Sequence, residues 1–422
     1  MTEERDARRS AREALALLAV AILLGMSVWF AASAAAPRLQ ARWELDATQA
    51  GWLTTLVQLG FVAGTLAAAL LNLADVVSAR TYFAASSASA ALANAALLAV
   101  PDYRAALLSR FLTGFFLAGV YPPAMKMAAT WFRSRRGLAI GILVGALTIG
   151  KSTPYLVDVI GGAGIGFIVL STSACGLLAA AMVAVAYRDG PYAFPRRPFS
   201  WGLVADVVGE RRWRLATGGY LGHMWELYAF WTWISAFLVA SSRAAGSGLG
   251  AVPTGGSAIG TGTKLAAFAA IAIGGAGCVW GGRVADRIGY ESLTIRAMAA
   301  SGSCALLVGL LFGGPAWLLL PVVLAWGFFV VADSAQFSAL VTEVVPPHAV
   351  GTALTLQVAS GFLLTMVTIQ LVPWISESLG WRWAFPVLAL GPGFGIASIR
   401  RLRRLRGLDG SGGAATPASC VR

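Results

Sequence analysis

Long apolar segments are the feature that most constrains how this chain folds. A helix needs about 20 apolar residues to cross a bilayer core about 30 Å thick. The chain contains twelve runs of roughly that length, and they lack the two-residue alternation of barrel strands, so we expect an all-α membrane protein. The predicted spans cover residues 14–36, 49–73, 81–100, 104–128, 137–160, 163–186, 215–240, 265–285, 292–312, 316–342, 350–375 and 383–399.

The composition excludes a water-soluble globular protein. Of the 422 residues, 58% are hydrophobic and 12% are charged, which is about half the charged share of a typical soluble domain. The first run has a second interpretation, because Arg8 and Arg9 precede an apolar stretch that ends in small residues, as in a cleavable signal peptide. Cleavage would leave eleven spans.

The distribution of basic residues predicts the orientation of the spans. With both termini in the cytoplasm, the cytoplasmic segments hold 23 Lys and Arg residues and the external loops hold six. This asymmetry is typical of multi-pass proteins of the bacterial inner membrane. Because the charge is spread over loops instead of forming one basic face, we expect a lipid bilayer and a small molecule as partners, and no nucleic acid.

The two halves of the chain share one pattern. Short matching motifs recur after spans 2 and 8, within spans 4 and 10, and at the start of spans 5 and 11, always 211 to 214 residues apart. Such duplication is typical of secondary transporters. The matched positions are Asp75 with Asp286, Gly114 with Gly327, and Gly137 with Gly351. The predicted organisation is an N-terminal six-helix bundle at residues 1–187, a cytoplasmic linker at 188–213, a C-terminal six-helix bundle at 214–400 and a disordered cytoplasmic tail at 401–422.

The turn after span 8 carries the most specific motif. It reads Gly282-x-x-x-Asp286-Arg287-x-Gly289, and the turn after span 2 keeps Asp75 and Arg80 of the same pattern. These turns resemble the cytoplasmic motifs of the major facilitator superfamily. The resemblance covers nearly the whole chain and implies two pseudo-symmetric six-helix bundles that rock about a central site. It also implies a gating role for Asp75, Arg80, Gly282, Asp286, Arg287 and Gly289.

Span 7 carries a narrower resemblance. The stretch GYLGHMWELYAFWTWISAFL is similar to bacterial members of this superfamily associated with nitrate, nitrite or cyanate. The chain departs from nitrate carriers in having no arginine in span 2 or span 8 of the sort that those carriers use to hold the anion.

Charged residues inside the spans are candidates for the transport site, since each costs about 2.5–3.5 kcal/mol at the bilayer centre. Arg110 either makes a contact with a substrate anion or a gating contact, or it is structural, as an ion pair or a clamp on backbone carbonyls that ties span 4 to neighbouring helices. Lys151 is expected to be neutralised by a substrate anion or by a carboxylate such as Asp333. For Lys126 and Asp158, near span ends, the favoured interpretation is that the side chains reach the headgroups.

Span 7 contains the candidate for proton coupling. Glu226 is expected near mid-bilayer, where a carboxyl group can take up and release a proton. His223 lies three residues before it on the same helical face and either shares that proton or bonds a neighbouring helix. Of the surrounding aromatic residues, Tyr228 is the one expected to reach a central cavity. Gln58, Gln336 and Gln357 either bind substrate or bridge helices.

These residues predict a secondary transporter for a small organic or inorganic anion, moved alone or with protons. Alternatives are an exporter of amphipathic drugs or metabolites, favoured by the aromatic residues of span 7, and a non-transporting membrane assembly factor or sensor, favoured by the altered turn at Asp75. An enzyme is not expected, because no nucleophile, base and orienting group form a known motif. No nucleotide motif or metal-ligand spacing is present, so we expect no cofactor and no metal, and we expect a monomer.

Overall fold

The structure, a computed structural model, describes residues 2–71, 73–132, 136–160, 164–192, 201–246, 260–346 and 348–411. In these ranges the regular structure is helical throughout. The first half contains α1 (Thr2–Met26), α2 (Ala31–Ala34), α3 (Ala36–Trp43), α4 (Ala47–Leu70), α5 (Leu73–Val76), α6 (Ala79–Ala96), α7 (Tyr103–Leu117), α8 (Tyr121–Ala129), α9 (Arg136–Ile160) and α10 (Ile165–Ala186). The short α11 (Trp201–Gly209) precedes the second half. That half contains α12 (Arg211–Ala244), α13 (Thr261–Ile288), α14 (Tyr290–Leu310), α15 (Ala316–Ala332), α16 (Ser334–Val344), α17 (Val350–Ser378), α18 (Trp381–Ala384), the 3-10 turn η2 (Pro386–Ala389) and α19 (Leu390–Ser411).

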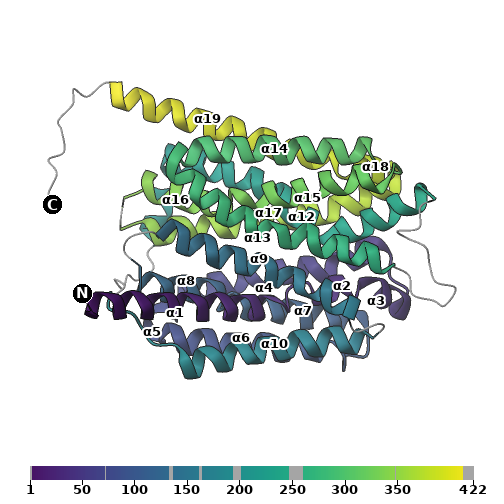
Figure 1. The fold of residues 1–422 in the computed structure, drawn as a ribbon, viewed down its shortest axis with the longest axis horizontal. Coiled ribbons are helices and arrows are strands. Elements are labelled where there is room, and N and C mark those ends of the chain that lie inside the picture. Colours follow the sequence, from purple (N-terminus) through teal and green to yellow (C-terminus); the bar gives the residue numbers. More distant parts are fainter. Residues whose placement is uncertain are drawn as a thin grey trace.

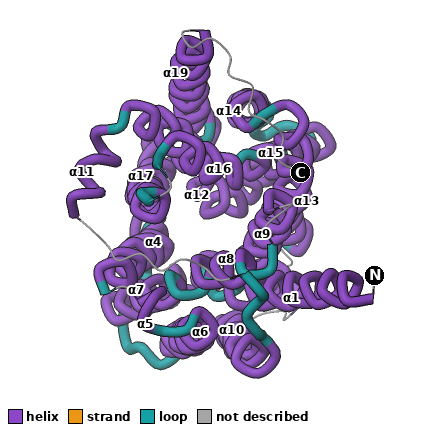
Figure 2. Tube along the Cα trace, turned by 90° about the vertical axis from the view of Figure 1, so that its left-hand side faces the viewer, coloured by secondary structure: helices purple, strands orange, loops and turns teal. Residues whose placement is uncertain are grey.

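The long helices run side by side along the longest axis of the molecule (Figure 1). Helix α1 begins and α19 ends at one end of the bundle, called here the termini end, while α2, α3 and α18 lie at the other, called the far end. Helices of the first half pack on one side of the molecule and those of the second half on the other (Figure 2). The halves meet chiefly where α9 packs on α13 and where α4 packs on α17.

Eight helical segments in the described ranges are long and apolar enough to cross a membrane. Each of the four predicted spans outside this set differs from a long, uninterrupted apolar helix for a recognisable reason. The first is interrupted after Met26 and the last is interrupted by η2. Helix α6 has only 18 residues and several Ser and Asn side chains, and α12 is rich in Trp, Tyr and charged residues.

Close glycine contacts show the duplication in three dimensions. A Cβ at Gly114 would clash with the carbonyl oxygen of Val57 where α7 meets α4, and a Cβ at Gly64 would clash with that of Phe115. In the second half Gly327 meets Ala270 and Gly277 meets Phe328 in the same way, where α15 meets α13. Each of these four residues of the second half lies 213 positions after its counterpart. Glycines let the backbones approach closely in lipid, where packing and not hydrophobic burial drives helix association.

The tail prediction is wrong for residues 401–411, which continue α19 as a helix. This extension is held at the termini end by Arg406, which binds Glu291 at 2.7 Å and Glu343 at 2.9 Å. Partial burial alone would lower the pKa of Arg406, but the two carboxylates outweigh it and hold that pKa above its ordinary value. The rest of the predicted tail, and residues 193–200 of the predicted linker, lie outside the described ranges.

Candidate functional site

Lys151 lies in a cage of aromatic rings between the two halves. Its Nζ atom lies 3.8 Å from the ring centroid of Trp29, 4.5 Å from that of Tyr228 and 5.2 Å from that of Trp231, and it donates a hydrogen bond to the Tyr228 hydroxyl. Lys151 is 1% exposed. We define the aromatic cage as Trp29, Phe30, Phe61, Tyr228, Trp231 and Phe362.

The cage draws its residues from both halves of the chain. Trp29 and Phe30 follow α1, Phe61 lies on α4, Tyr228 and Trp231 lie on α12, and Phe362 lies on α17. The centroids of Phe61 and Phe362 are 4.6 Å apart, and those of Tyr228 and Phe362 are 5.1 Å apart. A site at the interface between repeats is the usual place for substrate in folds of this kind.

Of the two partners expected for Lys151, a substrate anion or a carboxylate such as Asp333, the second is wrong. Within the ranges that the structure describes, no carboxylate lies within ion-pair distance of Lys151, because Asp333 contacts His223 instead. The charge is instead stabilised by ring faces, whose electron density attracts a cation. Two local features bring Lys151 into this position: Gly150 lets α9 approach the carbonyl of Leu23 on α1, and Pro154 cannot continue the hydrogen-bond ladder of α9.

Arg110 acts as a clamp on the break that follows α1. Its guanidinium donates hydrogen bonds to the carbonyl oxygens of Trp29 at 2.6 Å and Val28 at 3.2 Å, and to Oδ1 of Asn94 at 2.8 Å. Arg110 is fully buried. This is the second of the two interpretations that the sequence left open. Arg110 therefore positions Trp29, which covers Lys151, instead of lying in the cage itself.

His223 and Glu226, both buried on α12, belong to two separate clusters of polar side chains in the second half. Nδ1 of His223 lies 2.9 Å from Oδ1 of Asp333, and its Nε2 lies 2.8 Å from the Ser334 hydroxyl, at the break between α15 and α16. Glu226 instead accepts hydrogen bonds from Ser301 at 2.8 Å and from the indole N–H of Trp326 at 2.5 Å. His223 and Glu226 thus have different partners, and the described contacts contain no bond between them.

The candidate glutamines are all buried but differ in their contacts. Neither amide atom of Gln58 has a hydrogen-bond partner among the described residues. Gln357 donates a long bond of 3.5 Å to the carbonyl of Phe337, and Gln336 donates one of 3.4 Å to that of Ala332. Gln357 and Gln336 therefore brace helices through their amide nitrogens. Oε1 of Gln357 and both amide atoms of Gln58 are left available to a ligand.

The far end carries a charge cluster that the sequence did not predict. Asp158 at the end of α9 lies 2.7 Å from Arg38 on α3 and 2.9 Å from Lys264 at the start of α13. The expectation that Asp158 reaches the headgroups is wrong, since its side chain is only 5% exposed. We call Arg38, Asp158 and Lys264 the far-end latch, because the pair between Asp158 and Lys264 joins the two halves.

Comparison with known proteins decides the family. The Major Facilitator Superfamily pattern matches residues 17–368. The chain belongs to this superfamily. Two solved structures share its fold: a bacterial homolog to the human lysosomal transporter Spinster, in an inward-facing and unoccupied conformation, and the nucleoside transporter NupG. The first is 14% identical with a TM-score of 0.69, covering 97% of this chain and 99% of that one; the second is 14% identical with a TM-score of 0.67, covering 93% and 99%. None of the curated proteins compared with the chain matches it.

Membership of the Major Facilitator Superfamily makes this chain a multi-pass membrane transporter and not an enzyme. The expected likeness to nitrate, nitrite or cyanate carriers finds no support in these comparisons. Within the described residues there is also no group of three or more His, Cys, Asp and Glu side chains that could hold a metal ion.

The superfamily turn after α13 depends on a backbone conformation that suits glycine. Gly289 has φ of 85° and ψ of 154°, a region that is essentially restricted to glycine, and it joins α13 directly to α14. Gly282 is buried, while Asp286 and Arg287 are exposed and form no ion pair with the described residues. In the first copy Arg80 is exposed on α6, and the side chain of Asp75 lies outside what the structure describes.

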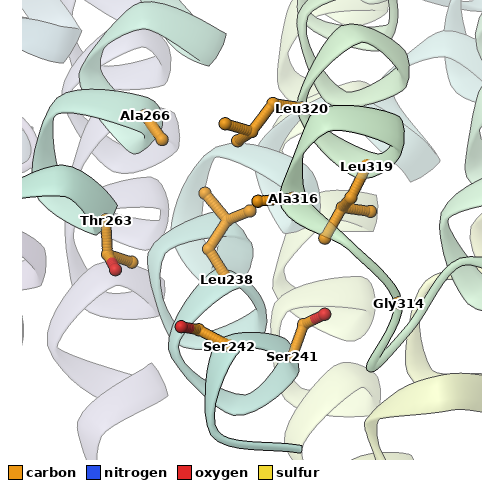
Figure 3. Close-up of a pocket in the computed structure, with 9 residues that line it drawn as sticks. All are labelled: Leu238, Ser241, Ser242, Thr263, Ala266, Gly314, Ala316, Leu319 and Leu320. Carbon is orange, nitrogen blue, oxygen red and sulfur yellow. The ribbon is translucent and has the colours of Figure 1, made fainter. Parts of the chain in front are cut away.

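A pocket at the far end lies apart from these residues. It is enclosed by the end of α12 and the starts of α13 and α15, so it belongs to the second half alone (Figure 3). Its lining is apolar apart from hydroxyl groups, among them that of Ser241, which accepts a hydrogen bond from the backbone N–H of Gly313. None of the predicted site residues lines it, so the aromatic cage remains the candidate site.

Proposed function

We propose that this transporter moves a small anion by alternating access, as a monomer in a bacterial inner membrane with its termini end in the cytoplasm. The observation that carries the proposal is Lys151, a buried ammonium that faces aromatic rings and has no carboxylate partner in the described ranges. A negatively charged substrate supplies the missing charge. The excess of Lys and Arg in the segments on the side of the termini supports the orientation.

The contacts between the halves support a state that is closed at the far end. The far-end latch joins α3, α9 and α13, and Gln370 on α17 donates a 2.9 Å hydrogen bond to Thr55 on α4. Near the cage, Tyr155 on α9 donates to the carbonyl of Trp231 on α12. We therefore propose that the cage, which is buried in this state, exchanges substrate with the cytoplasm when the halves part at the termini end, and that the latch breaks when the far end opens.

We further propose that Glu226 binds the coupled proton. Glu226 is 1% exposed, and the donors that its carboxyl group accepts from, Ser301 and Trp326, are both neutral. A carboxylate without a cationic partner is costly inside a membrane. The surroundings of Glu226 therefore favour the carboxyl group with a proton bound. His223 and Asp333 form a second buried pair of ionisable side chains in the same helix bundle.

Uptake into proteoliposomes tests the proposed function. Purified protein is reconstituted, and uptake of radiolabelled acetate, benzoate, nitrate and phosphate is measured with and without an inward proton gradient. We expect uptake of an anion that the gradient increases, and we expect Glu226→Gln to abolish the increase. Glu343→Gln is the matched control, since Glu343 is 38% exposed at the termini end. Anion uptake that is the same in Lys151→Ala and in the parent protein contradicts the proposal.

A second candidate function is export of an amphipathic drug or metabolite. The six rings of the aromatic cage favour it, since they offer a large apolar surface to a ligand. The buried charge of Lys151 opposes cationic drugs. Drug sensitivity of a deletion strain, compared with the same strain carrying the intact gene, distinguishes this function from anion uptake.

A further inference from the structure

Several hydrogen-bond donors around Lys151 have no acceptor. Nε1 of Trp29 and Nε1 of Trp231 are buried and unpartnered among the described residues, and both indoles lie beside the Lys151 ammonium. Lys151 itself has three N–H donors and, among the described residues, forms one hydrogen bond, to Tyr228. More than 90% of buried polar groups in proteins are satisfied, so a cluster of unsatisfied donors around a cation calls for an explanation.

A fourth donor lies on α4. Gln58 is fully buried, and its amide nitrogen has no partner in the described part of the chain. Gln58 precedes Phe61 by one helical turn, and Phe61 packs on Trp29 with ring centroids 5.1 Å apart. Beside Lys151 the unpartnered groups are therefore donors, gathered from α9, α12 and the break after α1, while Gln58 on α4 adds one unpartnered donor and one unpartnered acceptor. An oxyanion is the ligand chemistry that satisfies donors without adding others.

The other charged residues of the region are already occupied by the protein. Arg110 binds the carbonyls of Val28 and Trp29, and His223 contacts Asp333. Nε of Arg110 has no partner among the described residues, but its terminal nitrogens hold the break after α1, so Lys151 is the one cation, among the described residues, whose contacts place it among the rings of the cage. The single ammonium inside the cage matches an anion of one negative charge, because a second negative charge there would have no cation beside it.

We propose that the aromatic cage binds a monovalent organic acid, with its carboxylate held by Lys151 and the neighbouring indole N–H groups and its flat, unsaturated body packed against rings that separate to admit it. This inference rests on the proposed function and narrows its substrate class. The carboxylate has two oxygens for the donors of Lys151, Trp29 and Trp231. The rings of Phe61, Tyr228 and Phe362 pack on one another in this state, with centroids 4.6 and 5.1 Å apart, so a planar body stacks on them once these rings separate as the halves move.

The same contacts disfavour two other ligand classes. A small inorganic anion such as nitrate gains the charge interaction but leaves the ring faces without a partner. An aromatic cation gains the rings but is repelled by Lys151, which already occupies the ring faces of Trp29 and Tyr228. Charge and apolar surface are both needed, so affinity depends on a ligand that carries both.

Ligand-induced thermal stabilisation of the purified, full-length protein tests this inference. The probes are benzoate, its neutral analogue benzamide, the cation benzylammonium, and nitrate, each at increasing concentration. We expect benzoate to raise the apparent melting temperature in a saturable way, and the other three to bind at least tenfold more weakly. This comparison uses the unaltered protein and does not depend on any variant folding.

Variants then locate the site. We expect Lys151→Met to weaken benzoate binding at least tenfold, while Lys126→Met, the same change at another intramembrane lysine, leaves it unchanged. Trp29→Phe keeps a ring but removes the indole N–H, so it is expected to weaken benzoate more than it weakens benzamide.

Each other outcome overturns the inference in a distinguishable way. Nitrate that binds as tightly as benzoate, in a manner dependent on Lys151, refutes the organic-acid class but leaves anion transport intact. Preferential binding of benzylammonium, or equal binding of benzoate and benzamide, refutes both the substrate class and the role of Lys151. A protein that neither binds nor transports any probe of the four classes contradicts the proposed function itself.

Discussion

Neutralising Asp158 is expected to open the far end of the transporter. Asp158 holds two cations at 2.7 and 2.9 Å, and one of them, Lys264, lies in the other half. Each pair has a Coulomb energy of about 6 kcal/mol at an effective dielectric constant of about 20. Desolvation offsets most of this energy. Breaking a fully buried pair costs about 3–5 kcal/mol and breaking an exposed pair about 0.2–1 kcal/mol.

The far-end latch lies between these limits, since the side chains of Asp158, Lys264 and Arg38 are 5%, 11% and 24% exposed. We therefore expect Asp158→Asn to destabilise the closed far end by about 2 kcal/mol relative to the open one. This energy corresponds to a roughly 30-fold shift in the ratio of the two states.

Distances between spin labels measure this shift. Labels are placed at Glu44 and Glu377, two exposed positions in far-end segments of different halves, in protein whose four cysteines have been replaced. We expect a longer-distance population to grow strongly in Asp158→Asn. Asp46→Asn is the control, because Asp46 lies at the same end and caps α4 within one half. An unchanged distance distribution in Asp158→Asn, in protein that remains folded, would refute the latch.

Three further substitutions test the packing and the backbone. Gly114→Ala places a methyl group against the Val57 carbonyl and is expected to destabilise the protein by about 1–3 kcal/mol, whereas Gly166→Ala, with open space around it, is expected to be nearly neutral in thermal unfolding. Gly289→Ala is expected to cost about 1–3 kcal/mol because of its positive φ, and Gly351→Ala is its control; equal melting temperatures for these two variants would contradict the strain argument. Arg110→Met is expected to cost about 2–4 kcal/mol by leaving two buried carbonyls unpaired, and a normal melting temperature with lost anion binding would instead indicate a direct ligand contact.

Hydropathy predicted the helices well because it is a local property of the chain. Helices α4, α9 and α13 begin and end within a few residues of the predicted spans. The duplication was also visible, since the Gly114 and Gly327 motifs that revealed it are the positions where helix backbones make contact. The breaks were not predicted, because span 1 remains apolar through Ser27 to Phe30, where the helix is interrupted. Nothing in the local composition of that stretch separates a turn from a continuous helix.

Pairing between distant residues was the part that the sequence could not provide. Asp333 was a reasonable partner for Lys151 by charge, and Glu226 a reasonable partner for His223 by spacing. The structure instead joins Asp333 to His223, because the break between α15 and α16 brings Asp333 to α12. Partner choice depends on the rotation of each helix about its axis and on such breaks. Sequence patterns identify which charges are inside the membrane but not which of them meet.

The break after α1 connects the clamp to the cage. Interrupting a helix in lipid leaves carbonyl groups without their usual donors, at a cost of several kcal/mol for each one left unsatisfied. Arg110 satisfies the carbonyls of Val28 and Trp29, and this places the Trp29 ring over Lys151. The buried charge of Arg110 thus maintains a turn, and the turn supplies a ring that stabilises the charge of Lys151. Because both cations lie in the first half while Tyr228 and Phe362 come from the second, rocking of the halves would separate Lys151 from part of its aromatic cage. The affinity of the cage for an anion is therefore expected to differ between the two states of the transport cycle, which is the condition for a ligand to shift their populations.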